Sequence, residues 1–365
     1  MAYAPERCEI ITDQTKFLSL KRCWDDLYER SIEYDLTQSF EWCRCSWQIV
    51  AKPQGHRLHC LITWQGDRPV LIWPIVTHRR VLRTVAYPLS PETSEYSGVL
   101  VEAGPEAHQR IRVAWTMLCR NFDKINLPFV KKGSPLHRVI VAKKIAPCSV
   151  LETCSTPHVS WNGYQDWEDY YRSLKANFRH SLSRTRRRLI EHGNLTFELV
   201  QDRDRFPVIL DWIFRHKTEW FARTNITSVW RDAEIYKNFL LAVAQTKGIE
   251  QMKVFTLQVN DKIISAVVSR MSKLRLENVI TVFDPAYRKY GPGQLLHEDI
   301  LRWAFERRLD CDFRLGNQPY KRSWANSESE AITYQFVNSL RGAAFTTAGA
   351  AYTAATKWFN EVLGR

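Results

Sequence analysis

The fold of this chain is indicated most clearly by the stretch 277–324, which reads ENVITVFDPAYRKYGPGQLLHEDILRWAFERRLDCDFRLGNQPYKRSW. β-Branched and apolar residues mix over 276–284, as they do in a half-buried strand. A Gly-Pro-Gly turn follows, and after it apolar residues recur at helical spacing as far as Phe305. Residues 311–316 then predict a short second strand, and residues 317–324 predict the loop that leaves it.

The Gly-Pro-Gly turn has the composition of an anion-binding turn. Two glycines one residue apart, Gly291 and Gly293, allow positive φ and a close approach of the backbone to a ligand. A helix that starts just after them directs free N–H groups and the positive end of its dipole at the turn, which suits a phosphate or pyrophosphate. Arg288 can add a charge-assisted contact. A strand-to-helix turn that binds nothing is the alternative, and the glycines alone do not decide between the two.

The composition is that of a globular protein with a basic surface. A chain of 365 residues, 45% hydrophobic and 25% charged, is long enough for two ordinary domains or one large one. A net charge of +13 favours anionic partners, such as a phosphorylated cofactor, nucleic acid or an anionic membrane surface. A basic surface that serves only solubility would give the same charge.

Cysteine usage and hydropathy bear on the compartment. The nine cysteines are odd in number and form no CxxC pair, so the sequence predicts neither a zinc site nor a disulfide scaffold, and we expect no metal. The N-terminal residues lack the apolar core of a signal peptide, and no run is long enough to span a bilayer. We therefore expect a reducing, cytoplasmic location.

Two similar hairpins suggest that one fold occurs twice, with only the second copy keeping the glycine turn. Their strands are predicted at 58–64 and 70–76, and at 252–259 and 263–268. Between the hairpins, further strands are predicted at 81–88, 96–101, 124–127 and 139–143, and a helix at 107–122.

The segment 146–163 shows little periodicity and carries prolines and serines, so we expect the domain boundary there. The predicted domains cover residues 1–160 and 161–340. Residues 341–365 are predicted to form a C-terminal amphipathic helix, which either docks on the body or lies on a membrane surface.

A long basic helix is predicted from Asp166 to a glycine cap at Gly193. One face is apolar, whereas the rest is rich in positive charge at Lys175, Arg179, His180, Arg184, Arg186, Arg187 and Arg188. These side chains either contact an anionic substrate or cofactor, or they form a solvated face.

The ordered set of helix pair, hairpin, strand, Arg288-x-x-Gly291-x-Gly293, helix and strand resembles the acyl-cofactor half of the GNAT superfamily of N-acyltransferases. More narrowly, residues from about 166 to 324 resemble the CelD/BcsL-type acetyltransferases, which are relatives of the FemAB peptidoglycan aminoacyltransferases. The run 312–316, followed by Tyr320-Lys321 and Trp324, carries this narrower resemblance. The first half fits more loosely, through Ser39-Phe40-Glu41-Trp42 and the first hairpin.

The resemblance implies an α/β protein with a mixed sheet and a tandem GNAT-like (FemAB-like) architecture. In that superfamily the amides of the turn hold the pyrophosphate of coenzyme A, and the acyl group moves by direct attack without a covalent enzyme intermediate. The implied co-substrate is acyl-CoA, either acetyl-CoA or a longer-chain form. The implied contact residues are Arg288, Lys289, Tyr290, Gly291, Gly293 and Gln294.

Transfer from a thioester to an amine needs a general base, a donor for the oxyanion, and a proton or positive charge for the leaving thiolate. Asp312, His297 and Glu277 are the candidate bases near the turn. Asp312 is preferred because it lies in the matched run, and an ion pair with Lys321 or Arg314 that merely holds the loop is its alternative. Tyr320 is the candidate acid or oxyanion donor. Candidate substrate-binding residues are Lys321, Trp324, Arg179 and Arg186.

The leading hypothesis is an acyl-CoA-dependent N-acyltransferase that acts on an amine of a sugar, lipid or other small metabolite, in polysaccharide or envelope biosynthesis. A second hypothesis replaces the donor by an acyl carrier protein or an aminoacyl-tRNA, both of which are polyanionic and suit the basic helix. A nucleic-acid-binding protein is disfavoured apart from tRNA, since no binding motif is found. Peripheral contact with the inner membrane face through the terminal helix is a fourth hypothesis.

Overall fold

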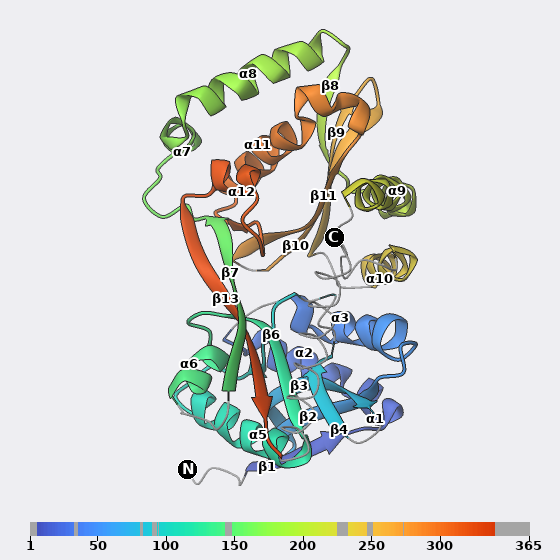
Figure 1. Cartoon of the computed structure of the whole chain (residues 1–365), viewed down its shortest axis with the longest axis vertical. Coiled ribbons are helices and arrows are strands. Elements are labelled where there is room, and N and C mark those ends of the chain that lie inside the picture. Colours follow the sequence, from blue (N-terminus) through green and yellow to red (C-terminus); the bar gives the residue numbers. More distant parts are fainter. Residues whose placement is uncertain are drawn as a thin grey trace, which may run out of the picture. The chain divides into compact units, whose positions relative to one another are not determined.

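The computed structural model describes residues 6–32, 36–80, 83–89, 93, 95–142, 148–224, 233–246, 251–272 and 274–339. The chain divides into two compact units (Figure 1). Unit 1 lies within residues 1–33, 51–153 and 332–365, and unit 2 within residues 34–50 and 154–331. The domain limits predicted at residues 160 and 340 stay a prediction.

Unit 1 is built on a mixed sheet. The strands follow one another in the order β1 (Glu6–Ile11), β2 (Arg57–Gln65), β3 (Arg68–Arg80), β4 (Arg83–Pro88), β6 (Lys124–Lys131) and β13 (Ser327–Val337), while β5 (Leu100–Val101) pairs with β3. Neighbours from β1 to β4 are antiparallel, whereas β4 and β6 are parallel. The first predicted hairpin is confirmed, with Gly66 at a φ of 62° in its turn.

In the part of unit 1 that the structure describes, the named helices are α1 (Gln14–Ser19), α2 (Lys21–Glu29), α5 (Ala107–Asn121) and α6 (Pro135–Ala142). In the core, Trp115 of α5 packs edge-on against Phe336 of β13, with the ring centroids 4.4 Å apart. The strand predicted at 139–143 is wrong for residues 139–142, which belong to α6, and residue 143 lies outside the described residues. Pro135 suits the first helical position and Ser134 Oγ accepts a hydrogen bond from His137 N, so the local caps favour a helix that the short apolar run did not reveal.

The sheet strands of unit 2 follow one another in the order β7 (Cys148–Val159), β12 (Asp310–Asp312), β11 (Arg275–Phe283), β10 (Lys262–Met271), β9 (Met252–Val259) and β8 (Leu195–Leu199). Strands β8 to β11 are antiparallel, and β11 and β12 are parallel. The second hairpin is confirmed, and Asn260 and Asp261 both have positive φ, as a tight hairpin turn requires. The segment 146–163 was expected to be irregular, but most of it is strand β7.

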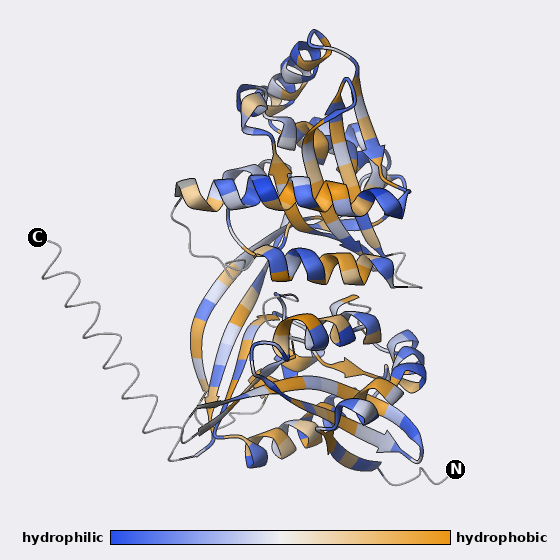
Figure 2. Ribbon diagram, turned by 90° about the vertical axis from the view of Figure 1, so that its right-hand side faces the viewer, coloured by the Kyte–Doolittle hydropathy of each residue, from blue (hydrophilic) through white to orange (hydrophobic). Residues whose placement is uncertain are grey.

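Helices cover both faces of the unit 2 sheet (Figure 1). One face carries α7 (Trp167–Ser173), α8 (Ala176–Ile190), α11 (Pro292–Phe305) and α12 (Pro319–Trp324); the other carries α9 (Phe206–Thr224) and α10 (Ala233–Gln245). Along β10 the side chains alternate, since Ile264 and Val267 join the α11 core whereas Ala266 and Val268 join the α9–α10 core. In Figure 2, polar and apolar residues alternate along α9 and α10 in the foreground, as amphipathic helices require.

A short segment from the first half of the chain also belongs to unit 2. It comprises the 3₁₀ turn η1 (Leu36–Gln38), α3 (Phe40–Cys45) and the π-helical turn η2 (Ser46–Ala51). Ser39 caps α3 by accepting a hydrogen bond from Trp42 N. The buried Trp42 ring packs edge-on against Phe239 of α10 at 5.0 Å, which fixes this segment on the α9–α10 face.

Two further expectations are corrected in unit 2. The long basic helix is broken, because Leu174 and Lys175 have extended ψ angles of 151° and 131°, so that α7 ends and α8 begins anew. The predicted start of the helix is confirmed, because Asp166 caps α7 by accepting a hydrogen bond from Asp169 N at 2.8 Å. Residues 317–324 were expected to be a loop, but Pro319 opens the short helix α12.

The last named element of the chain is strand β13, which ends at Val337. Among the described residues, no helix is both long and apolar enough to cross a membrane. The predicted C-terminal amphipathic helix over 341–365 lies outside the described residues.

Candidate active site

The glycine turn lies between β11 and α11 in unit 2. Asp284 Oδ1 accepts a hydrogen bond from Ala286 N at 2.9 Å and so caps the 3₁₀ turn η5 (Pro285–Tyr290). Gly291 follows with φ 55° and ψ 47°, a left-handed conformation that an L side chain adopts only at a cost. A Cβ at Gly291 would meet nothing within 4 Å, so glycine is needed there for the backbone angle and not for space.

The first turn of α11 presents an anion-binding end. Pro292 has no N–H, so the Gly293 amide is the first donor of the helix, at a position where an α-helix supplies no acceptor of its own. A Cβ at Gly293 would lie 3.8 Å from Phe283 Cδ1 and 4.0 Å from Ser265 Oγ, which is ordinary contact. Alanine therefore fits at 293, whereas a large side chain would enter the turn.

The other residues predicted to hold the cofactor divide into two groups. Arg288 and Lys289 are exposed at the end of η5, where their charges lie beside the helix terminus. The Tyr290 ring is 9% exposed and its hydroxyl hydrogen-bonds to His192 Nε2, so this side chain anchors the turn. Gln294 Oε1 accepts a hydrogen bond from Trp324 Nε1 at 2.6 Å. Of these four residues, only Arg288 and Lys289 therefore have side chains available to a ligand.

Strand β12 pairs with only the first part of β11. Their parallel pairing runs from Arg275 with Asp310 to Glu277 with Asp312, where β12 ends, while β11 continues to Phe283. The β10–β11 register shifts in the same region, so that Val279 is the extra residue of a β-bulge. Past Glu277, β11 therefore has no partner strand on its β12 side among the described residues, and its backbone groups can pair with an extended ligand.

His297 and Tyr320 lie together in this region. The rings stack with centroids 5.5 Å apart and an interplanar angle of 13°, and Phe313 packs edge-on against His297 at 5.6 Å. Burial, helped by the charge of Lys321, lowers the pKa of His297 to about 3. An imidazole with so low a pKa is a weak proton acceptor at neutral pH, which does not favour His297 as a general base.

The two acidic candidates are neighbours across β11 and β12. Asp312 Oδ1 accepts a hydrogen bond of 2.6 Å from Arg314 N, and Oδ2 lies 3.7 Å from the guanidinium of Arg275. Glu277 is buried and ion-paired with Arg270 of β10, itself 2% exposed. Glu277 is therefore held in a buried pair, whereas Asp312 has a longer contact with a half-exposed arginine.

The predicted substrate-binding residues mostly hold the protein itself. The Lys321 ammonium donates hydrogen bonds to Leu315 O at 2.5 Å and Arg314 O at 3.4 Å, and thus secures the loop after β12. Trp324 is fully buried and packs edge-on against Phe178 of α8. Arg179 Nε donates to Leu174 O at 3.2 Å, at the break between α7 and α8.

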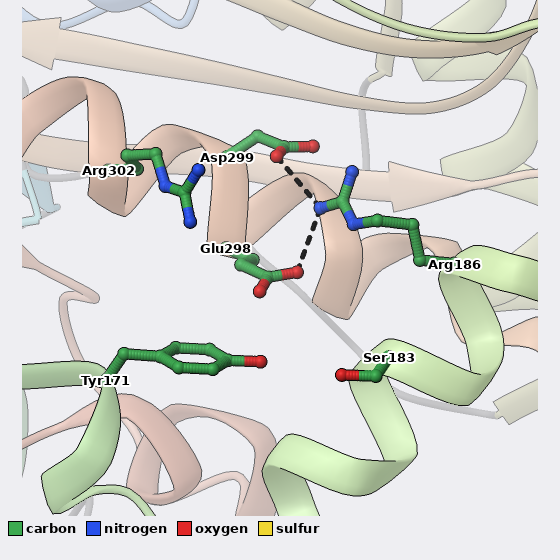
Figure 3. A pocket seen from close by; sticks show the side chains of 6 residues that line it. All are labelled: Tyr171, Ser183, Arg186, Glu298, Asp299 and Arg302. Carbon is green, nitrogen blue, oxygen red and sulfur yellow. Dashed lines mark hydrogen bonds and ion pairs between the residues drawn. The ribbon is translucent and has the colours of Figure 1, made fainter. Parts of the chain in front are cut away.

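Arg186 bridges α8 and α11 (Figure 3). One guanidinium nitrogen lies 2.8 Å from Glu298 Oε2 and 2.9 Å from Asp299 Oδ1. The pair borders a polar cavity of about 310 Å³ that Tyr171, Ser183 and Arg302 also line. Burial raises the pKa of Asp299 even though Arg186 opposes this. Sequence reasoning missed this clamp, although two adjacent acids on a helix beside an arginine-rich one were a usable signal.

Comparison with known proteins agrees with this geometry. Residues 176–322 match the family model described as acetyltransferase (GNAT) domain. The match includes α8, the glycine turn, α11, β12 and most of α12. No curated protein matches the sequence.

Several solved structures have a similar fold. FemX is similar over 91% of this chain and 97% of its own, with a TM-score of 0.59 and 12% identity. The C-terminal domain of a putative lysylphosphatidylglycerol synthetase from Agrobacterium fabrum covers 92% of this chain and 96% of its own, with a TM-score of 0.56 and 13% identity. L-PGS from Bacillus licheniformis covers 90% and 94%, with a TM-score of 0.55 and 9% identity. Residues 176–322 thus form a GNAT acetyltransferase domain within a tandem GNAT-like α/β fold, and the protein is an N-acyltransferase.

Proposed function

We propose that this N-acyltransferase takes its acyl group from acyl-CoA and moves it by direct attack to an amine of a sugar, lipid or other small metabolite. We further place it among the CelD/BcsL-type acetyltransferases, with a role in polysaccharide or envelope biosynthesis. One observation carries the proposal: the left-handed Gly291 sets the start of α11 against Phe283, at the end of the part of β11 that continues beyond its pairing with β12.

The turn fits the diphosphate of coenzyme A. The Gly293 amide and the positive end of the 14-residue helix α11 attract an anion, and the exposed Arg288 and Lys289 add two positive charges. The unpaired edge of β11 beyond Glu277 then gives an extended thioester arm hydrogen-bonding groups to follow toward Tyr320.

The chemistry assigns roles to two residues. Asp312 is the proposed general base, because it ends β12 within the run that matches the family, whereas Glu277 is held by a buried arginine. Tyr320 is the proposed acid that gives its proton to the leaving thiolate. Lys321, which directly follows this acid, and Trp324, one turn further along α12, hold it in place, since Lys321 donates to a loop carbonyl and Trp324 to Gln294.

The experiment that tests the proposal is mass spectrometry of the purified protein for co-purified thioester, followed by an amine screen with acetyl-CoA and longer acyl-CoA donors. Acylation of an amine with release of free thiol supports the proposal. Full consumption of an aminoacyl-tRNA or acyl carrier donor, with no turnover of any acyl-CoA, would replace it.

One observation favours that second donor class. His180 and three arginines, Arg184, Arg187 and Arg188, lie exposed on one side of α8, and within the part of the chain that the structure describes no ion pair joins any of them to an acid. Such a stripe suits a polyanionic carrier protein or tRNA. Replacing Arg184 and Arg187 by Gln together should weaken binding of a polyanionic donor and leave acetyl-CoA turnover unchanged.

The location remains part of the proposal. We expect the protein in the cytoplasm, with peripheral contact to the inner membrane face if the acceptor is a lipid. Flotation with anionic liposomes, compared between the full chain and a chain ending at Arg341, tests the contribution of the terminal segment.

A further inference from the structure

His297 of α11 is a buried polar side chain whose two ring nitrogens are both unsatisfied among the described residues. It is 1% exposed, and neither Nδ1 nor Nε2 has a hydrogen-bond partner among the described residues. A neutral imidazole has one N–H donor and one acceptor nitrogen, and buried groups of this kind nearly always find partners. A donor kept out of water without a protein acceptor is suited to an acceptor that arrives with a ligand.

The position of His297 on α11 connects it to the glycine turn. His297 follows Gly293 by four residues, so the two lie on one face of the helix. The Cα of Gly293 faces Phe283 and Ser265, that is, the ends of β10 and β11. The same face is therefore directed at the sheet, and under the proposed function a thioester arm held at the turn would extend along this part of β11, which continues without β12.

The neighbours of His297 hold its ring in place but give its two nitrogens no hydrogen-bond partner among the described residues. Tyr320 stacks on one side and Phe313 packs against it edge-on, both through apolar ring surface. The surroundings therefore fix the plane of the imidazole and leave its nitrogens unpaired. Such preorganisation is what an oxyanion donor needs, because no reorientation is required during the reaction.

We propose that the His297 imidazole, in its neutral form, donates an N–H hydrogen bond to the carbonyl oxygen of the bound thioester and to the oxyanion that develops there. This inference rests on the proposed acyl-CoA-dependent function and adds the oxyanion donor to it. It also reverses the role expected from the sequence, in which His297 was a candidate base.

Bonds, electrons and protons all balance in the proposed transfer. The amine lone pair forms the new C–N bond, and the π electrons of the carbonyl move to the oxygen that His297 contacts. When the carbonyl re-forms, the C–S bond breaks and its electron pair leaves on sulfur. The amine nitrogen loses one proton to Asp312 and the sulfur gains one from Tyr320, which recovers it from solvent, so that an amide and a free thiol result.

Neutrality is an advantage in this role. The low pKa of His297 keeps the ring uncharged over the physiological range, so its donor strength does not change with pH. A neutral imidazole with a lowered pKa is an established kind of electrophilic donor to a carbonyl oxygen. The contribution of His297 to turnover should therefore be constant between about pH 5 and pH 8.

The test uses isotope-edited infrared difference spectroscopy of acetyl-CoA labelled with ¹³C at the thioester carbonyl and bound to the full chain without acceptor. In the wild type the carbonyl band should lie at lower frequency than in free acetyl-CoA. In His297→Phe the band should return toward the free value while the dissociation constant from calorimetry stays the same. His297→Gln, which retains an N–H donor, should keep part of the shift.

Turnover provides the second readout. With an accepted amine, kcat should fall about 10²–10³-fold in His297→Phe, the usual loss for one oxyanion donor, with little change in KM for acetyl-CoA. A carbonyl band that is identical in wild type and His297→Phe, with acetyl-CoA bound to both, would overturn the inference and leave the proposed function standing. Failure of the wild type to bind acetyl-CoA would instead overturn the proposed function itself.

Discussion

Trp324 Nε1 donates a hydrogen bond of 2.6 Å to Gln294 Oε1, and this bond joins the end of α12 to the first turn of α11. Trp324 is fully buried, and the Tyr170 hydroxyl donates to its backbone carbonyl at 2.6 Å. The proposed acid and the proposed diphosphate turn are thus parts of one packed assembly. Disturbing the bond should affect both stability and the affinity for acyl-CoA.

Trp324→Phe tests this coupling. The change leaves Gln294 without its donor and should lower the free energy of unfolding by about 1–3 kcal/mol, the usual cost of a lost buried hydrogen bond. KM for acyl-CoA should rise because the start of α11 is held less firmly. Urea unfolding and steady-state kinetics measure the two effects. Trp303→Phe, on the far side of α11 beside Phe255, is the control and should leave KM unchanged.

Arg186 is predicted to be a clamp between helices. Arg186→Met leaves Glu298 and Asp299 facing each other, and should destabilise the protein by about 1–2 kcal/mol, less than for a fully buried pair because the arginine is partly exposed. Arg187→Met, at the exposed neighbouring position, is the matched control. Equal unfolding midpoints for the two variants would show that the clamp contributes nothing.

Tyr320 should affect turnover more than binding. Tyr320→Phe keeps the ring that stacks on His297 but removes the proton for the thiolate, so kcat should fall by about 10²-fold or more while the dissociation constant for acyl-CoA is unchanged. Tyr287→Phe, another partly buried tyrosine next to the turn, is the control. An unchanged kcat in Tyr320→Phe would exclude the role.

His297 predicts a pH dependence of stability. Its folded pKa of about 3 lies below the ordinary value of 6.5, so between these values the unfolded chain binds more protons than the folded one. The stability contributed by His297 is therefore present above pH 6.5 and is lost as pH falls toward 3, by about 1.4 kcal/mol per pH unit. His297→Gln should lack this component, which urea unfolding of both proteins at pH 7, 6 and 5 would reveal. Parallel curves would contradict it.

The sequence predicted those parts of the fold that depend on local patterns. The two hairpins, the strand before the glycine turn and α11 follow from periodicity and turn residues, which act within a few positions of the chain. Helix α12 was missed because its own residues are largely polar. It is held by distant partners instead, with Lys321 bonded to loop carbonyls and Trp324 bonded to Gln294.

In the candidate site, too, the sequence predicted only the features that depend on residues close together in the chain. Gly291 and Gly293 were identified because their spacing alone implies the turn. The roles of His297 and Arg186 depend on burial and on which helices face each other. An imidazole without a partner or an arginine between two acids appears only when α8, α11 and α12 are packed together.

The central claim is that the start of α11 binds the diphosphate of a thioester donor, and calorimetric titration of acetyl-CoA into Gly293 variants tests it most directly. Gly293→Ala should bind like the wild type, because a Cβ there makes only ordinary contacts. Gly293→Trp should lose binding while its thermal unfolding and circular dichroism stay those of the folded protein. Undiminished binding of acetyl-CoA by folded Gly293→Trp would contradict the account.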